Sequence, residues 1–327
     1  MSNPLSVDDP QGFAHHFART NGIDLHYVEE GQGPLVILLH GFPYLWYMWR
    51  RQIRALAAAG YRVVAPDIRG FGQSECPHQD CDMLHCVGDL VGLMQQLGES
   101  SAVIIGHDLG AWVAYTAAQT RPDLFRALGI LNTPVTPRDA QPPSDGWKML
   151  ESKTGKRFYQ EYFQHAQAEQ EMDADIRKTL RSIYYAISGD AQGAERWRLF
   201  IGKEENFLDT VFDPVQFPDW LTQQAQDYYV SQYSRNGFVG PLSHYRARDR
   251  NWQQSAFLEG CKIQQPSFFI GGAGDPAAEL FMPNFDKLES HMPNLRSKTL
   301  LEGVGHSAAE EQPDQVNQLL LAFLDEC

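Results

Sequence analysis

The sequence predicts an α/β fold with a mostly parallel central sheet flanked by helices and a helical block inserted into it. Short apolar, β-branched runs are followed by polar or glycine-rich turns and helical patterns, which is typical of parallel strands. From about Trp147 to Trp252 the pattern is helical, rich in charge and aromatics, and free of strand alternation. Strand character returns only after this block, so we expect the chain to leave the sheet and come back to it.

Six segments carry the strand pattern in chain order. They span residues 35–39, 61–67, 101–105, 127–132, 266–272 and 298–301. The third segment runs through a glycine-flanked turn into a helix expected at residues 111–118. The fourth is followed by residues 133–143, which are too proline-rich for a helix and are expected to form a linker.

These patterns predict a division of the chain into two core parts and a cap. The first core part covers residues 1–134, a helical cap domain covers 135–252, and the second core part covers 253–327. Ligands of open α/β sheets bind at the carboxyl ends of the strands, so a helical block inserted there is expected to act as a lid.

Composition excludes several classes of partner. With 327 residues and 43% apolar content the chain can bury a large core. The net charge of −14 argues against nucleic acid and anionic membrane surfaces. The apolar run Leu319–Leu324 is far shorter than the roughly 20 residues of a membrane span, and Met1–Asp9 has no signal-peptide pattern. We therefore expect a soluble cytoplasmic protein without nucleic-acid or membrane partners.

The five cysteines do not suggest disulfides or a metal centre. Their number is odd, and the group around Cys76, Cys81, His85 and Cys86 matches none of the usual zinc-ligand spacings. Cys86 is instead expected on the buried face of a helix, with the rest of the group, including His78, in the loop before it. No metal and no cofactor are predicted.

The segment Gly106–Gly110 carries the most specific chemical signal. Its central residue, Asp108, stands in a strand–turn–helix context where a serine nucleophile is often found, and flanking glycines permit a sharp elbow. Read alone, the segment is equally compatible with an ordinary turn in which an aspartate caps the helix.

Three further segments favour the catalytic interpretation. A loop follows the first strand at His40–Pro43, a turn of the form Asp-x-x-Gly-x-Gly-x-Ser lies at Asp67–Ser74, and Gly303–His306 follows the last strand. Together with the elbow, these motifs resemble the epoxide hydrolases of the aspartate-nucleophile branch of the α/β-hydrolase fold. The resemblance extends from about Phe17 to Leu324.

A carboxylate nucleophile limits the reactions that are feasible. Asp108 is ionised at neutral pH without a base, and its attack on a saturated carbon with a leaving group gives a stable alkyl ester. His306 can then act as the general base that activates water against this ester. The backbone N–H groups of Phe42 and Leu109 are the candidate oxyanion donors.

Asp275 is the candidate for orienting His306. It follows a strand and precedes Pro276, which favours an extended backbone at Asp275. Some relatives carry this acid after an earlier strand, but the corresponding residue here, Asn132, has no charge. The order Asp108, Asp275, His306 matches nucleophile, acid and base as this fold usually presents them.

An epoxide differs from other substrates because its leaving alkoxide needs a proton. The resemblance implies that lid tyrosines supply it, at Tyr245 and, in a less specific motif, at Tyr159, where Tyr162 competes. Phe42, His107 and Leu109 are the expected substrate-binding residues. The lid is rich in aromatics, which favours a lipophilic epoxide. These aromatics are Trp147, Trp197, Phe200, Phe207, Phe212, Phe217 and Trp220.

Two other functions remain as alternatives. A haloalkane or haloacid dehalogenase would use the same elbow, but Leu109 and Phe42 offer no side-chain donors for a halide, and residues 111–118 lack arginine. The other alternative is a catalytically inactive α/β-hydrolase that serves as a binding protein, although every required polar group is present. The oligomeric state is left open, with a homo-oligomer as one alternative.

Overall fold

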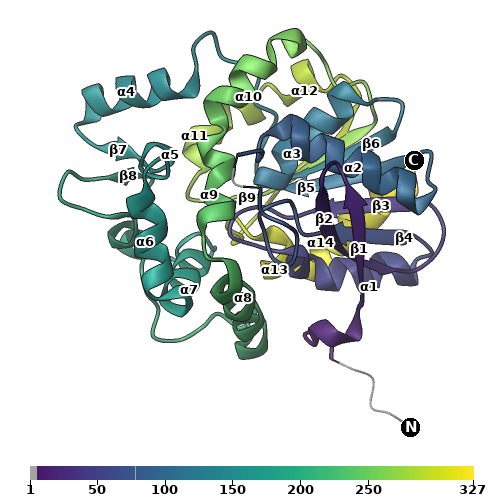
Figure 1. The fold of residues 1–327 in the computed structure, drawn as a ribbon, viewed down its shortest axis with the longest axis horizontal. Helices are drawn as coiled ribbons and strands as arrows, with labels where there is room; N and C mark the ends of the chain where they lie inside the picture. The colour runs from purple at the N-terminus through teal and green to yellow at the C-terminus, as the bar shows by residue number, and fades with distance from the viewer. Residues whose placement is uncertain (1–5, 78) are drawn as a thin grey trace.

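The computed structural model describes residues 6–77 and 79–327, and its centre is an eight-stranded sheet (Figure 1). The strand order is β1-β2-β4-β3-β5-β6-β9-β10. Only the β1–β2 and β2–β4 pairs are antiparallel, so the predicted mostly parallel α/β sheet is confirmed. The strands are β1 Ala14–Thr20, β2 Ile23–Glu30, β3 Leu35–Leu39, β4 Arg62–Pro66, β5 Ala102–His107, β6 Phe125–Leu131, β9 Ser267–Gly272 and β10 Leu295–Leu301.

The N-terminal hairpin of β1 and β2 is an element that the sequence patterns did not predict. Its two strands join through Asn21 and Gly22, both with positive φ (46° and 86°), as a two-residue hairpin turn requires. Most of β1 is partly or fully exposed, because it lies at the sheet edge. Its polar residues therefore give no clear apolar alternation.

Core helices cover both faces of the sheet. In Figure 1, α2 and α3 lie above the strands, and α1 and α14 lie below them. The central strands β3 and β5 are consequently buried along their whole length, which explains why they read as continuous apolar runs. The core helices are α1 Arg50–Ala58, α2 Met83–Leu97, α3 Leu109–Thr120, α11 Ala278–Phe285, α12 Leu288–His291, α13 Ala308–Glu311 and α14 Pro313–Leu324.

The chain between β6 and β9 forms an inserted block of helices, with α4 to α8 on the left in Figure 1 and α9 and α10 nearer to its centre, next to the core. Residues 133–142 contain no helix or strand, in agreement with the expected linker. The helices that follow are α4 Pro143–Thr154, α5 Tyr159–Tyr162, α6 Ala166–Ala174, α7 Ile176–Ala186, α8 Gln223–Asn236, α9 Val239–Arg246 and α10 Arg248–Gln254. The division into core and cap domains at residues 134 and 252 stays a prediction.

The prediction that this block is wholly helical is wrong. Strands β7 (Arg157–Phe158) and β8 (Phe200–Ile201) pair antiparallel in a separate two-stranded sheet. Each has only two residues, too few to produce an alternating pattern in the sequence. None of the helices among the described residues has the length and apolar content that a membrane span requires.

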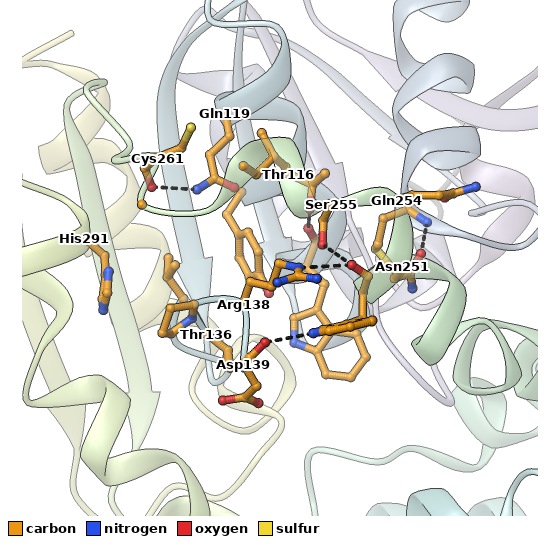
Figure 2. A pocket seen from close by; sticks show the side chains of 18 of the residues that line it. Thr116, Gln119, Thr136, Arg138, Asp139, Asn251, Gln254, Ser255, Cys261 and His291 are labelled. Carbon is orange, nitrogen blue, oxygen red and sulfur yellow. Dashed lines mark hydrogen bonds between the residues drawn. The ribbon is translucent and has the colours of Figure 1, made fainter. Parts of the chain in front are cut away.

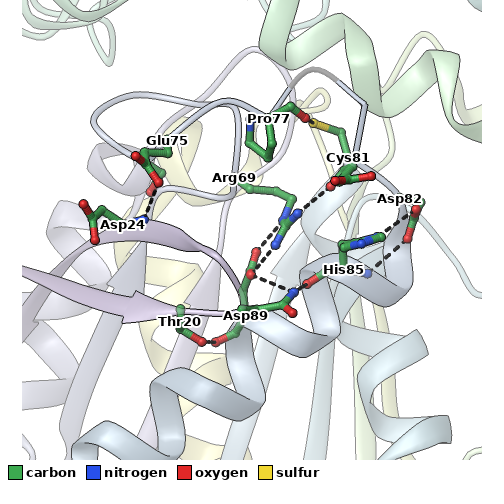
Figure 3. Close-up of polar contacts among 12 residues, drawn as sticks. Thr20, Asp24, Arg69, Glu75, Pro77, Cys81, Asp82, His85 and Asp89 are labelled. Atoms are coloured by element: carbon green, nitrogen blue, oxygen red, sulfur yellow. Dashed lines mark hydrogen bonds and ion pairs between the residues drawn. The ribbon is translucent and has the colours of Figure 1, made fainter.

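A buried ion pair connects the turn after β4 to helix α2 (Figure 3). The Arg69 guanidinium donates to both carboxylate oxygens of Asp89, 2.6 Å from Nε to Oδ2, and also to the Asp80 carbonyl at 2.6 Å. Removing one partner from such a pair costs about 3–5 kcal/mol, because the other charge stays buried. The pair therefore holds the Asp67–Ser74 turn against the core.

The cysteine segment lies beside this pair. Cys86 is buried in α2, as expected, and Cys81 precedes that helix. His85 is not in the loop, contrary to the prediction, but in the first turn of α2, where its ring bonds to the capping residue Asp82 at 2.9 Å. His78 lies outside the described residues.

Candidate active site

Asp108 occupies a strained turn between β5 and α3. Its backbone has φ 52° and ψ −116°, a conformation that non-glycine residues rarely adopt. The turn is tight enough that a Cβ at Gly110 would lie 2.4 Å from the carbonyl oxygens of Leu39 and His40. Only glycine fits there. The side chain of Asp108 is thus held at the carboxyl end of the sheet, where ligands of such folds bind.

His306 lies between the two aspartates that the sequence predicts beside it. Its Nδ1 is 2.7 Å from Asp275 Oδ2, and its Nε2 is 3.5 Å from Asp108 Oδ2. All three side chains are buried or nearly so. The bond to Asp275 orients the imidazole so that Nε2 faces the elbow carboxylate.

Asn132 donates a hydrogen bond to Asp275, a contact that the sequence did not predict. Its Nδ2 donates to Asp275 Oδ2 at 3.3 Å and to the Gly305 carbonyl at 3.0 Å. The Ala277 N–H donates to the other oxygen, Oδ1 of Asp275, at 2.8 Å. Asn132, which stands where some relatives carry the acid, therefore helps to position Asp275 in the loop after β9.

The loop that carries His306 is held by groups far away in sequence. The His306 N–H donates to the Ile187 carbonyl at 2.8 Å. Glu311 accepts from the N–H groups of Gly305 and Ser307 at 2.8 and 2.9 Å, on either side of the histidine. Burial raises the pKa of Glu311 to about 7, and these N–H donors oppose that rise. The sequence pattern gives no signal for these contacts.

The charges of the site stabilise one another. Burial lowers the pKa of His306, but the charges of Asp275 and Asp108 and hydrogen bonds to both outweigh burial and raise it to about 10. Burial raises the pKa of Asp108, but bonds from His306 and the Phe42 N–H, and the His306 charge, reverse the effect and leave it lowered. At neutral pH the site therefore holds an ionised carboxylate beside an imidazolium.

One of the two expected oxyanion donors contacts the Asp108 carboxylate. The Phe42 N–H donates to Asp108 Oδ1 at 3.0 Å. This approach requires glycine at position 41, because a Cβ there would lie 2.4 Å from the Cβ of Asp108. The other expected donor, the Leu109 N–H, begins helix α3, where backbone N–H groups have no intrahelical partner.

A narrow cavity of about 30 Å³ lies over Asp108 and His306. Both expected tyrosines, Tyr159 and Tyr245, line it, and so does Phe42. The remaining lining is apolar and comes mainly from the inserted segment. It consists of Phe163, Ile183, Ile187, Trp197, Phe207, Val211, Ala277 and Phe281. Among the lid aromatics expected from the sequence, Trp197 and Phe207 thus reach the cavity.

The structure distinguishes Tyr159 from Tyr162. The Tyr162 hydroxyl donates to Glu171 Oε2 at 2.8 Å, away from the cavity. The rings of Tyr159 and Tyr245 are 6.2 Å apart, centroid to centroid. Burial, followed by the nearby charge of Asp108, raises the pKa of both, so both phenols are protonated at neutral pH.

His107 and Leu109, also expected to bind substrate, are fully buried and are not among the cavity residues. His107 lies beneath the site, where its Nε2 donates to the His306 carbonyl at 2.7 Å. Burial and the charge of His306 lower the pKa of His107 to about 4, so the ring is neutral. It supports the backbone of His306 and does not contact the cavity.

The chain resembles known proteins over almost its whole length. Residues 34–313 match the family model of the alpha/beta hydrolase fold. Epoxide hydrolase A of Mycobacterium tuberculosis is 37% identical over 93% of this chain and 95% of its own. An epoxide hydrolase of Caballeronia sordidicola is also 37% identical, over 98% and 97% of the two chains.

Solved structures of epoxide hydrolases also resemble this chain over almost its whole length. An epoxide hydrolase from an endophytic Streptomyces superposes with a TM-score of 0.92 at 39% identity, covering 96% of each chain. Epoxide hydrolase A from Mycobacterium thermoresistibile superposes with a TM-score of 0.89 at 37% identity, covering 96% of this chain and 98% of the other.

Proposed function

Since the chain belongs to the α/β-hydrolase fold family and, within it, to the epoxide hydrolases, we propose that it converts a lipophilic epoxide to a vicinal diol through a covalent ester on Asp108. The observation that carries this mechanism is the position of Asp108. An ionised carboxylate occupies the elbow, an imidazolium lies 3.5 Å away, and two phenols line the same cavity. The apolar walls of that cavity favour a lipophilic substrate.

In the first step, Asp108 attacks one carbon of the epoxide. The new carbon–oxygen bond forms as the ring carbon–oxygen bond breaks, and the released alkoxide takes a proton from Tyr245 or Tyr159. A phenol is a stronger acid than the alcohol that forms when the alkoxide is protonated, so the proton transfer from tyrosine to alkoxide is favourable. The negative charge of Asp108 raises the pKa of both tyrosines and is consumed as the ester forms. The phenols therefore become stronger acids during the step.

In the second step, water attacks the ester carbonyl. His306, once deprotonated, takes a proton from this water, and the carbonyl oxygen becomes an oxyanion held by the N–H groups of Phe42 and Leu109. As the tetrahedral intermediate collapses, the departing alkoxide takes the proton from His306 and leaves as the diol. The proton that remains on the Asp108 carboxyl group returns to the tyrosinate, which restores the carboxylate and the phenol. In this mechanism the oxyanion donors act on the enzyme's own carbonyl.

The two steps should respond differently to pH. Esterification removes the Asp108 charge that helps to hold the pKa of His306 at about 10, so the pKa in the ester lies below that value. We expect ester hydrolysis to accelerate with rising pH, with a midpoint below 10, because only neutral His306 acts as a base. Alkylation should not show this rise, since Asp108 is ionised throughout. Single-turnover rates between pH 6 and 10 measure both steps, and hydrolysis that slows with rising pH would contradict the assignment.

Isotope labelling tests the covalent route directly. In a single turnover in ¹⁸O-water with enzyme in excess, the diol should carry an oxygen from the unlabelled carboxylate, and the label should stay on Asp108. Direct attack of activated water on the epoxide would put the label into the first-formed diol and none on the Asp108 peptide. Mass spectrometry of the diol and of the peptide distinguishes the two routes.

A further inference from the structure

The structure contains a second and larger cavity, of about 480 Å³, whose lining is drawn in Figure 2. It is bounded by α3, by the linker after β6, by α10 and by the loop before β9. None of the described residues that line it also lines the catalytic cavity. Trp112 faces the second cavity and Tyr245 the first, and their rings meet at a centroid distance of 6.3 Å. These two rings therefore form part of the wall between the cavities.

The second cavity is positively charged, although the chain carries a net charge of −14. Among the described residues, its lining contains Arg138, Arg248 and Lys262 but only one carboxylate, that of Asp139. Burial and the positive charges of Lys262 and Lys287 lower the pKa of His291, another lining residue. A small ligand held here would therefore be an anion.

Each of the two arginines is fixed by an indole. The guanidinium of Arg138 lies 4.1 Å from the ring of Trp252, and that of Arg248 lies 3.9 Å from Trp112. Such stacking orients a guanidinium and leaves its N–H edges available for a planar anion. Arg138 donates from Nε to the Trp252 carbonyl at 3.1 Å and from Nη1 to Glu259 at 3.4 Å.

Arg248 is different, because it has no ion-pair partner among the side chains that the structure describes. Its Nε is buried without a hydrogen bond, and so are Asn251 Nδ2 and Gln254 Oε1, which line the same cavity. Leaving polar groups unpaired in this way costs about 1–3 kcal/mol each, and more for a charge. A bound carboxylate would satisfy Arg248, since the fork of a guanidinium matches a carboxylate.

The rest of the lining can accept an apolar body. Met83, Leu84, Val135 and Leu258 contribute aliphatic surface next to the two indoles. A volume of about 480 Å³ is within the usual range of about 300–1,000 Å³ for small-molecule sites. Asp139 and the Glu259 that pairs with Arg138 balance two of the three positive charges named above, so the cavity matches a ligand with one negative charge.

We propose that this second cavity is a binding site for a small organic monocarboxylate with an apolar body, held through its carboxylate by Arg248. The ligand stacks its body along Trp112 and Trp252 and occupies the cavity independently of the epoxide. The site is thus separate from the catalytic cavity and does not depend on the mechanism assigned to Asp108.

Calorimetric titration with decanoate tests the site. The wild-type protein should bind decanoate saturably, and Arg248→Met should weaken binding about 10-fold or more, as expected for the loss of a charge-assisted hydrogen bond. Arg121→Met is the matched control, because Arg121 pairs with Asp123 outside the cavity and should leave binding unchanged. Equal affinity in the wild type and Arg248→Met, or no binding of decanoate to the wild type, would overturn the proposal.

A kinetic measurement shows in which of the two cavities decanoate binds. With styrene oxide as substrate, decanoate at the second site should not compete, so the apparent KM should not rise in proportion to decanoate concentration. Strictly competitive inhibition would place decanoate in the catalytic cavity and overturn the proposal. Ser255→Trp provides a second variant that fills the space without removing a charge, and it should abolish decanoate binding if the cavity is the site. If a folded Ser255→Trp protein binds decanoate as tightly as the wild type, the proposal that this cavity is the site is wrong.

Discussion

Asp108→Ala is expected to abolish turnover, whereas His306→Gln should permit the first step and trap the alkyl-enzyme ester. The reason is the division of labour between the two residues. In the proposed mechanism Asp108 forms the bond to the substrate, and the base is needed only when water attacks the ester. Loss of a positioned general base costs roughly 10²–10⁴-fold in rate, so the ester in His306→Gln should last longer than in the wild type by about that factor.

Mass spectrometry of His306→Gln after incubation with substrate measures this result. The protein should gain the mass of one substrate molecule, located on the peptide that contains Asp108. His16→Gln is a suitable control, because His16 is exposed on the edge strand β1 and should turn over normally. An adduct on any cysteine, or a fully active His306→Gln protein, would refute the assignment.

The second large effect is expected at the tyrosines. Tyr245→Phe should slow epoxide opening roughly 10²-fold or more, which is the usual contribution of a positioned acid. The double variant with Tyr159→Phe should retain almost no activity, because no other described phenol lines the catalytic cavity. Rapid mixing with styrene oxide under single-turnover conditions isolates this step from hydrolysis of the ester.

Tyr162→Phe is the matched control for both substitutions. Tyr162 lies close to Tyr159 in sequence, but its hydroxyl donates to Glu171 and does not reach the cavity. It should leave the rate of epoxide opening close to that of the wild type. If the double variant folds normally and hydrolyses styrene oxide at the wild-type rate, the role of the tyrosines as acids is wrong.

Local sequence determined the six strands β3, β4, β5, β6, β9 and β10 of the sheet, and it pointed to the main residues of the candidate active site. The predicted strand at residues 35–39 coincides with β3, because a strand buried on both faces must be apolar along its whole length. The elbow at Asp108 was predictable because a sharp turn needs glycines at fixed positions beside one exposed functional group. Asp275 and His306 were predictable because each lies in a glycine-containing loop a few residues after the end of a strand.

Tertiary structure decided everything that depends on distant packing. The support of Asp275 by Asn132 and of the His306 loop by Glu311 joins residues whose patterns show no relation to one another. The choice between Tyr159 and Tyr162 depends on which phenol turns toward the cavity, and both have the same local sequence character. The second cavity arises where α3, the linker and α10 meet. The sequence could not predict that its arginine is unpaired. Burial and hydrogen bonding are properties of the packed chain, and no local pattern encodes them.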